Sequence, residues 1–410
     1  MKEKGSRNDI KAKGENTMKK VYSILITVCL FYVFSFGTST VFAAQIDSDT
    51  VSDDGTRIVN ISPNGEEDDT LSIRKVLKDS MCNKLVVNFA PGEYTLTNSL
   101  PIFDNTTLNA NGAVFNQKTY GKGLLINGFH MNSSYGKGSG GYGSLKNVVI
   151  NGGTWVGTTE PNTEKTLKDN GFYVGYSSFL FMHAQNITVK NCSFMNNYNG
   201  HFIELAGVKN ARIENCNMAM SGSRYVGEGS NEAIQIDNTY QQSNSPSGAP
   251  WDDTACENIT ISNCKIKFAR GIGTNRVGNT FFKNIKVQGC TITSTNEALN
   301  MYDVLGLNVS KCTIKTTGKF KDYRSVAMYV GLDSVPKGGN ASKANATITN
   351  NKIYGNTAGL KMWNLKSKAK FNKVTIKGNK IYCKKGKDKA LQHTKSIKKF
   401  VKSKNSIKKW

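Results

Sequence analysis

The stretch Asn258-Ile-Thr-Ile-Ser-Asn-Cys264-Lys-Ile266 decides the fold, because the chain repeats its pattern several times. Apolar residues alternate with polar residues up to Asn263, which is the period of a β-strand. After Asn263 the alternation slips by one residue, so Cys264 and Ile266 face the same side as the apolar residues before the slip. Asparagine and glycine tolerate the left-handed backbone that such a bend requires. Copies of the pattern carry Gly153, Cys192, Cys216, Cys264, Cys290, Cys312, Asn351 and Asn379 at the cysteine position, and bends are predicted at Asn191, Asn215, Asn263, Gly289, Asn350 and Gly378.

The repeat has the length of one coil of chain. Most successive copies lie 22–28 residues apart, and the larger intervals of 39 and 48 residues hold a coil plus a long loop. One short strand per sheet per turn buries nothing alone, whereas stacked turns build a continuous core. A column of stacked asparagines can also share side-chain hydrogen bonds from coil to coil. The sequence therefore predicts an all-β chain wound as a single-stranded parallel β-helix.

The repeat resembles the right-handed parallel β-helix of the pectin-lyase-like superfamily over residues 60–385. The start of this region fits the resemblance, because Asp68-Asp69-Thr70 predicts a helix N-cap. Members of that superfamily often begin with a capping helix and an apolar strand that ends in Pro-Gly-x-Tyr, as Leu85 to Tyr94 does here. The resemblance therefore implies an N-terminal capping helix, which would cover open strand edges.

The two ends of the chain differ in composition from the repeats. Lys19 and Lys20 precede an apolar run over 21–36 and a small-residue cleavage pattern at Val41-Phe-Ala43. This order predicts a secretory signal peptide over 1–44, with an uncleaved N-terminal anchor as the alternative. We expect a linker over 45–59, the β-helix domain over 60–385 and a Lys-rich C-terminal tail over 386–410. A signal peptide implies a secreted, extracellular protein, and cell-wall association is the further option.

Positive charge is concentrated at the C-terminal end. The formal net charge is +24, and residues 361–410 hold 18 lysines against one acidic residue, Asp388. Clustered lysines hold anionic polymers by releasing counterions, so this end predicts binding to anionic cell-wall polymers such as teichoic acids or acidic polysaccharides. The alternative is a solvated tail with no partner. We expect a monomer with no nucleic-acid partner and no membrane contact after signal cleavage.

Cysteines in a secreted chain first suggest disulfides. Five of them, however, occupy the same position of the repeat, where stacked side chains run parallel inside the core. This placement favours a ladder of buried thiols. No pair of cysteines or histidines has zinc-ligand spacing, so no metal ligands are predicted.

A second strand precedes each Asn/Cys strand, and its outward residues are the candidates for chemistry. Aligned by alternation, these strands place Glu204, Gln235, Gly273 and Asn300 in one outward row and Ala206, Asp237, Asn275 and Tyr302 in the next. His201, Glu232, Arg270 and Glu297 lead into the strands. Members of the superfamily generally use this sheet as a polysaccharide cleft, which the resemblance implies here.

The spacing of two acids supports a carboxylate mechanism. Glu204 and Asp237 differ by one coil and two residues, which separates their β-carbons by about 8 Å. Such a pair can span the roughly 6.5–9.5 Å that admits a water in inverting glycoside hydrolysis. His201 stacks near Glu232 and can serve acid–base work. We therefore predict Glu204, Asp237, Glu232 and His201 as catalytic, and Gln235, Arg270, Asn275, Asn300, Tyr302, Trp251, Arg224 and Tyr225 as substrate-binding; the alternative is that these residues are only solvated.

The family motifs leave the activity open. None of the Asn-Thr-Asp, Asp-Asp, Gly-His-Gly and Arg-Ile-Lys motifs of polygalacturonases appears at a matching position of this sheet, and the Arg-x-Pro-x-x-Arg setting of pectate lyases is absent. The His-x-x-Glu of 201–204 with the acids of 232–237 resembles secreted bacterial β-helix repeat proteins of unassigned activity. A glycoside hydrolase would use Glu204 and Asp237, whereas a polysaccharide lyase would use Arg270 or His201 as base. We expect no cofactor, with calcium on the acids only in a lyase. A non-catalytic, cell-wall-associated glycan-binding or adhesive protein is the alternative from another class, and an epimerase is a further option.

Overall fold

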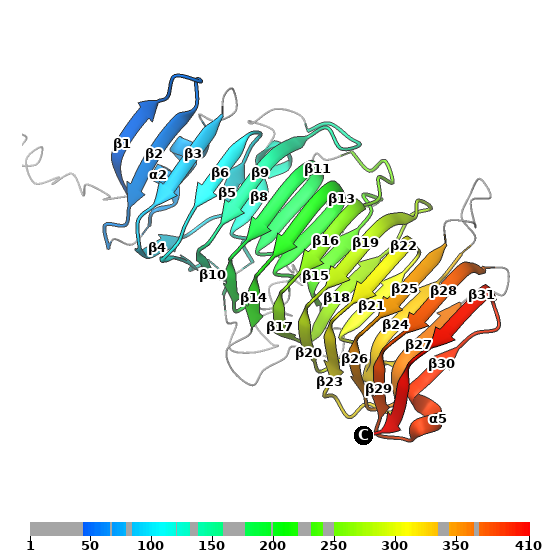
Figure 1. The fold of residues 1–410 in the computed structure, drawn as a ribbon. Helices are drawn as coiled ribbons and strands as arrows, with labels where there is room; N and C mark the ends of the chain where they lie inside the picture. The colour runs from blue at the N-terminus through cyan, green and yellow to red at the C-terminus, as the bar shows by residue number, and fades with distance from the viewer. Residues whose placement is uncertain are drawn as a thin grey trace, which may run out of the picture. The chain divides into compact units, whose positions relative to one another are not determined.

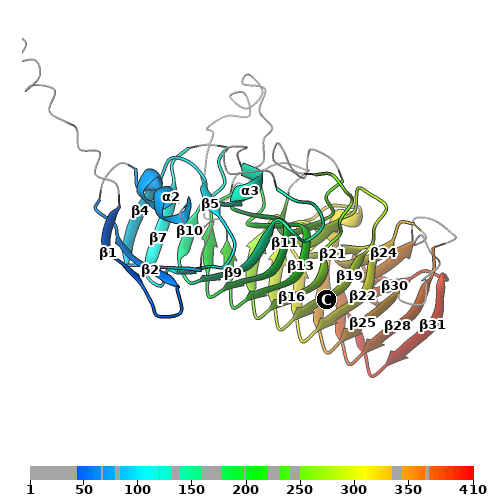
Figure 2. The ribbon, with the colours of Figure 1, turned by 90° about the horizontal axis from the view of Figure 1, so that it is seen from above.

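Each coil of the chain contributes strands to three ladders, as the computed structural model shows for residues 44–65, 68–78, 84–119, 121–131, 138–158, 177–197, 200–219, 231–240, 250–334, 344–364 and 369–410. Successive coils pair in parallel and lie side by side along the stack (Figures 1 and 2). The predicted parallel β-helix is confirmed.

The first ladder carries the strands on which the site was predicted. The long strands β11 (Phe179–Lys190) and β13 (Ile203–Glu214) begin in this ladder and continue into the second. The other strands of the first ladder are β5 (Leu100–Ile102), β8 (Leu125–Asn127), β15 (Glu232–Asp237), β18 (Arg270–Asn275), β21 (Leu299–Tyr302), β24 (Val326–Leu332), β27 (Ala358–Asn364) and β30 (Leu391–His393).

The second and third ladders contain the two halves of the Asn/Cys repeat. The second ladder comprises β2 (Arg57–Ser62), β3 (Leu85–Phe89), β6 (Thr106–Asn109), β9 (Leu145–Asn151), β16 (Glu257–Ser262), β19 (Phe282–Gln288), β22 (Val304–Ser310), β25 (Asn345–Thr349), β28 (Phe371–Lys377) and β31 (Ile397–Ser403). The third comprises β4 (Gly92–Leu96), β7 (Ala113–Gln117), β10 (Thr154–Val156), β12 (Ser193–Met195), β14 (Asn217–Ala219), β17 (Lys265–Phe268), β20 (Thr291–Ser294), β23 (Thr313–Thr316), β26 (Lys352–Gly355), β29 (Lys380–Cys383) and β32 (Ser406–Lys409).

The bends between the second and third ladders lie where the sequence predicts them. Asn191, Asn215, Asn263, Gly289, Asn350 and Gly378 all have positive φ. A side chain on Gly289 would also meet the Asn263 side-chain oxygen at 2.5 Å, so the Asn263 amide would have to move to make room for it. The bend returns the cysteine to the interior, where Cys192, Cys216, Cys264, Cys290 and Cys312 are buried free thiols. The predicted thiol ladder is confirmed.

Asparagine side chains connect the coils on the outside. Asn258 donates to Asn210 at 3.0 Å and accepts from Asn284 at 2.9 Å. Asn210 donates to Asn186, and Asn186 to Asn147, in the same column. These residues also have positive φ, so one side chain satisfies both a bend and an amide ladder.

The N-terminal end is more structured than predicted. The predicted 45–59 linker is wrong, because β1 (Gln45–Val51) pairs antiparallel with β2, which in turn pairs with β3. Helix α2 (Thr70–Lys78) follows and buries Ile73, Val76 and Leu77, although its capping role stays a prediction. The predicted signal peptide lies outside the described residues apart from Ala44. None of the helices in the described part of the chain is long and apolar enough to span a membrane.

The C-terminal end is also folded. The prediction of a tail over 386–410 is wrong, because α5 (Lys387–Ala390) and strands β30, β31 and β32 complete a further coil. The prediction failed because lysines surround Ile397 and Phe400 in the sequence, although both apolar side chains pack against the core. The short helices α3 (Gly128–Met131) and η4 (Tyr323–Ser325) lie in connections between strands.

Candidate active site

The outer face of the first ladder brings the predicted residues into register. Glu204 lies beside Gln235, Gln235 beside Gly273, and Gly273 beside Asn300. The predicted alignment of these strands is therefore correct. The second outward row runs in the same register through Ala206, Asp237 and Asn275.

Asp237 is a buried carboxyl group with an incomplete set of partners. Its exposed fraction is 1%, and Gln235 Nε2 donates to Oδ2 at 2.7 Å. Oδ1 has no hydrogen-bond partner within the described segments. Burial and the neighbouring Glu204 raise the pKa of Asp237 well above its ordinary value, against the opposing effect of the Gln235 hydrogen bond. The protonated form of Asp237 is therefore favoured.

Glu204 lies diagonally across one register step from Asp237 and is better supplied with groups that favour its charge. Ser177 Oγ donates to Oε2 at 2.5 Å. Burial raises the pKa of Glu204, whereas His201 and Ser177 act in the opposite direction. Because Glu204 also raises the pKa of Asp237, the two groups titrate as a pair. We assign the more persistent proton to Asp237.

A row of charges borders the pair where the strands begin. His201 Nδ1 donates to the Glu232 carbonyl oxygen at 2.7 Å and lies 3.9 Å from the Glu232 carboxylate. Arg270 contacts Glu232 at 3.1 Å and Glu297 at 3.3 Å. Burial alone would lower the pKa of Arg270, but the two carboxylates raise it overall, so this guanidinium holds its proton. An arginine bound in this way is poorly suited to act as the base of a lyase.

The same face becomes aromatic towards the C-terminal coils. Asn300 lies beside Tyr329, and Tyr329 lies beside Lys361. The ring of Tyr302 covers Gly331, where an added Cβ would approach the ring at 2.4 Å. The Lys361 ammonium lies 5.5 Å from the Tyr329 ring centre and 5.0 Å from that of Trp363, which is 45% exposed.

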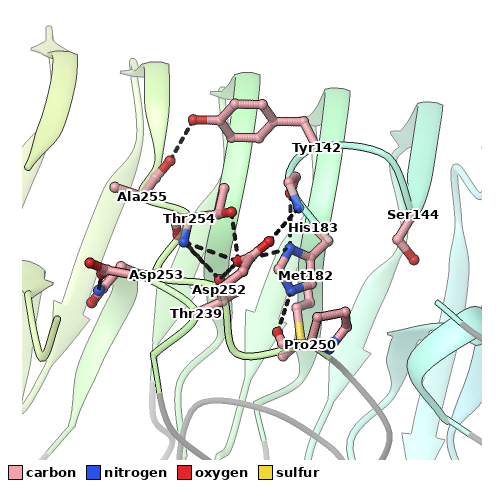
Figure 3. A network of polar contacts seen from close by, with 12 residues as sticks. Tyr142, Ser144, Met182, His183, Thr239, Pro250, Asp252, Asp253, Thr254 and Ala255 are labelled. Carbon is pink, nitrogen blue, oxygen red and sulfur yellow. Dashed lines mark hydrogen bonds and ion pairs between the residues drawn. The ribbon is translucent and has the colours of Figure 1, made fainter. Parts of the chain in front are cut away.

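The loop after β15 is fastened to neighbouring coils by a polar network (Figure 3). His183 faces the Gly141 carbonyl at 2.9 Å through Nδ1 and the Pro250 carbonyl at 2.8 Å through Nε2. Asp252 accepts from Thr239, Thr254 and the Gly141 backbone N–H. These contacts anchor Pro250 and Asp252 on either side of Trp251, whose side chain is 48% exposed.

Sequence reasoning found the acids and missed the groups that hold them. The contact of Ser177 with Glu204 and the anchoring by His183 join residues tens of positions apart, and no repeat signals either of them. The predicted residues Arg224 and Tyr225 lie outside the described residues. Asn275 is exposed beside Asp237, as a ligand-facing position requires.

Two other features bear on the chemistry. A depression of 310 Å³ on the outer face of the second ladder is lined by Asn258, Asn284, Lys286 and their neighbours and has no acidic residue in its lining. It is therefore unsuited to carboxylate catalysis. Within the described segments no group of three or more His, Cys, Asp or Glu side chains is arranged to hold a metal ion.

Comparisons with known proteins place the fold. No protein-family model matches the chain. Plasmin and fibronectin-binding protein A of Streptococcus pneumoniae is 22% identical over 307 residues, which are 59% of this chain and 41% of that relative. The chain thus spans less than half the length of this curated relative.

Two solved structures have a fold similar to that of this chain. The crystal structure of PfbA, a surface adhesin of Streptococcus pneumoniae, matches with a TM-score of 0.54 and 17% identity over 82% of this chain and 87% of that one. A polygalacturonase from Erwinia carotovora matches with a TM-score of 0.53 and 11% identity over 90% and 95% of the two chains. The chain therefore has the right-handed parallel β-helix fold of pectin-lyase-like proteins, and at these identities the similarity shows the fold alone.

Proposed function

We propose that this protein is an extracellular glycoside hydrolase that cleaves a polysaccharide along the outer face of the first ladder. Asp237 acts as general acid and protonates the leaving oxygen of the glycosidic bond. Glu204 acts as general base and removes a proton from the attacking water, so that the bond breaks with inversion. His201 and Glu232 bound the site on one side: His201 favours the charged form of Glu204, and Glu232 adds to the rise in the pKa of Asp237.

The observation that carries the proposal is the burial of Asp237 next to Glu204. The Asp237 carboxyl is 1% exposed, has one oxygen without a described partner and lies near a second carboxyl. These surroundings raise its pKa, so that it keeps its proton to higher pH than a solvated aspartate does. Catalytic acids need this environment, and unequal surroundings of two carboxyls separate the roles of acid and base. Trp363, five coils from Glu204 and 45% exposed, then offers a surface on which a sugar ring can stack.

The test is a screen of the protein against acidic and neutral polysaccharides with product analysis. A hydrolase releases reducing ends without the near-ultraviolet absorption of an unsaturated lyase product. Asp237→Asn and Glu204→Gln should each reduce the rate by about 10²- to 10⁴-fold, the range of general acid–base catalysis. Glu214→Gln is the matched control, because Glu214 lies on the same strand β13 but pairs with Arg212 on the second ladder. Full activity in both site variants, or products with retained configuration, contradicts these roles.

An adhesive protein is the second candidate. It is favoured by the similarity to plasmin and fibronectin-binding protein A and by the adhesin with the same fold. On this interpretation the protein binds host or wall components without cleaving them, and Glu204→Gln together with Asp237→Asn leaves binding unchanged. Measured binding that survives these substitutions, with no cleavage of any glycan in the screen, favours the adhesin. The similarity to a surface protein also supports the proposed extracellular location in both cases.

A further inference from the structure

The C-terminal coils carry a positive surface with almost no compensating acid. Residues 335–410 contain 21 lysines, no arginine and one acidic residue. That residue, Asp388, pairs with the adjacent Lys389 at 3.1 Å. Several of the described lysines lie on strands of these coils, which hold them at fixed positions.

The third ladder arranges several of these lysines in columns. Lys352 lies beside Lys380 in one outward column, and both are exposed. Neighbouring coils are about 4.8 Å apart, so the two ammonium groups repel each other along the stack. No described carboxylate forms an ion pair with either of them. The next outward column runs through Lys315, Tyr354, Tyr382 and Lys408.

Aromatic rings lie between the charges. The rings of Tyr354 and Tyr382 stack with centres 4.7 Å apart and planes 2° from parallel. Trp410 lies 5.5 Å from Tyr354 and is 38% exposed. The ammonium groups of Lys315 and Lys384 lie 5.1 and 4.7 Å from the Trp410 ring centre. The surface therefore alternates fixed cations with the rims of aromatic rings.

We propose that this lysine–aromatic surface of the third ladder binds a linear anionic glycan whose sugar units carry carboxylates. Carboxylates neutralise the lysine columns, and sugar rings contact the exposed part of Trp410. This surface is on a different ladder from Glu204 and Asp237, so it anchors the protein to a polymer independently of the proposed cleavage. The inference does not rest on the proposed hydrolase.

The test measures binding of polygalacturonate by calorimetry in a Glu204→Gln background, which prevents digestion. Fully methyl-esterified polygalacturonate is the uncharged probe and should bind weakly. Each exposed ion contact is worth a factor of about two to five, so Lys352→Gln/Lys380→Gln/Lys408→Gln should weaken binding about tenfold to hundredfold. The dependence of the affinity on salt should flatten in the same variant.

The matched control carries Lys265→Gln/Lys267→Gln/Lys286→Gln, which removes the same charge from exposed positions on β17 and β19. It should bind nearly as tightly as the background protein. Equal weakening in both triple variants would show attraction by net charge alone and overturn the site. Inorganic polyphosphate or duplex DNA binding as tightly as polygalacturonate would overturn the glycan assignment. All substituted lysines are exposed, so far-ultraviolet circular dichroism should confirm an unchanged fold.

Discussion

Arg270 offers the sharpest test of the charge row beside the site, through the substitution Arg270→Gln. Its guanidinium lies between Glu232 at 3.1 Å and Glu297 at 3.3 Å. The side chains of Arg270, Glu232 and Glu297 are only 21%, 11% and 2% exposed. Glutamine removes the cation and leaves two buried carboxylates without it.

The expected loss in the free energy of unfolding is about 3–5 kcal/mol at neutral pH. Each contact has a Coulomb energy of about 5 kcal/mol at an effective dielectric constant of about 20, which desolvation partly offsets. Breaking a buried pair by removing one partner typically costs about 3–5 kcal/mol, because the remaining charge is uncompensated.

The loss should depend on pH in a defined direction. Burial raises the pKa of Glu297 above its ordinary value of 4.5, and Arg270 opposes this rise. Without Arg270 the pKa rises further, so the folded protein keeps a proton that the unfolded chain has lost. Stability relative to the unsubstituted protein should therefore fall as pH increases through the unfolded-state value. Below that value Glu297 is protonated in both states, and only a smaller hydrogen-bond deficit remains.

The assay is equilibrium denaturation in guanidinium chloride at several pH values, with Arg212→Gln as control. Arg212 pairs with Glu214 but is 64% exposed, so its loss should cost less than about 1 kcal/mol at every pH. The second substitution Glu297→Gln should recover much of the loss in Arg270→Gln. A deficit equal to that of Arg212→Gln, or one that does not change with pH, would refute the proposed electrostatic role of Arg270.

Three further predictions concern single residues. Asn258→Ala should destabilise the protein by about 2–3 kcal/mol, because it loses two ladder hydrogen bonds and a favourable residue at positive φ; Asn258→Gly should lose less, as denaturation can show. Asp237→Asn should raise stability at neutral pH and leave it unchanged near pH 3, because the raised pKa of Asp237 makes the folded state less stable as pH rises above the ordinary value of 3.8. His183→Phe should speed amide hydrogen exchange in residues 251–255 and spare the second ladder, because it removes both contacts to carbonyl oxygens.

The fold was predictable because every coil obeys one local rule. Alternation followed by a slip at Asn263 and its equivalents determines which side chains face inward, and the coil length determines which residues stack. The two wrong predictions, the linker and the tail, lie at the ends of the chain, where the repeat pattern is weak or missing. Residues 45–59 pair antiparallel with no copy of the repeat, and the last coil hides Ile397 and Ile407 among lysines.

For the candidate site, the sequence could predict only which residues are neighbours in the strand register. Counting residues places Glu204 beside Gln235 and Asp237 one row away, and the structure agrees. Burial of Asp237 is different, because a polar residue on an outward face predicts solvation. Its exposed fraction of 1% therefore could not be read from the repeat.

The loss of fold stability that an ionised Asp237 causes bears on the choice between cleavage and adhesion. A surface that only binds another protein gains most from exposed aromatic and arginine side chains, and it gains nothing from a carboxyl group that destabilises the fold when it ionises. An asparagine at this position would keep the contact with Gln235 and remove that cost. A carboxyl held protonated beside a second carboxyl has a use when a proton must be delivered to a leaving group. The stability gain expected for Asp237→Asn and its expected loss of cleavage therefore test the same proposition from opposite sides. A variant that gains stability and retains binding, in a protein that cleaves no glycan of the screen, would leave the adhesive function as the better account.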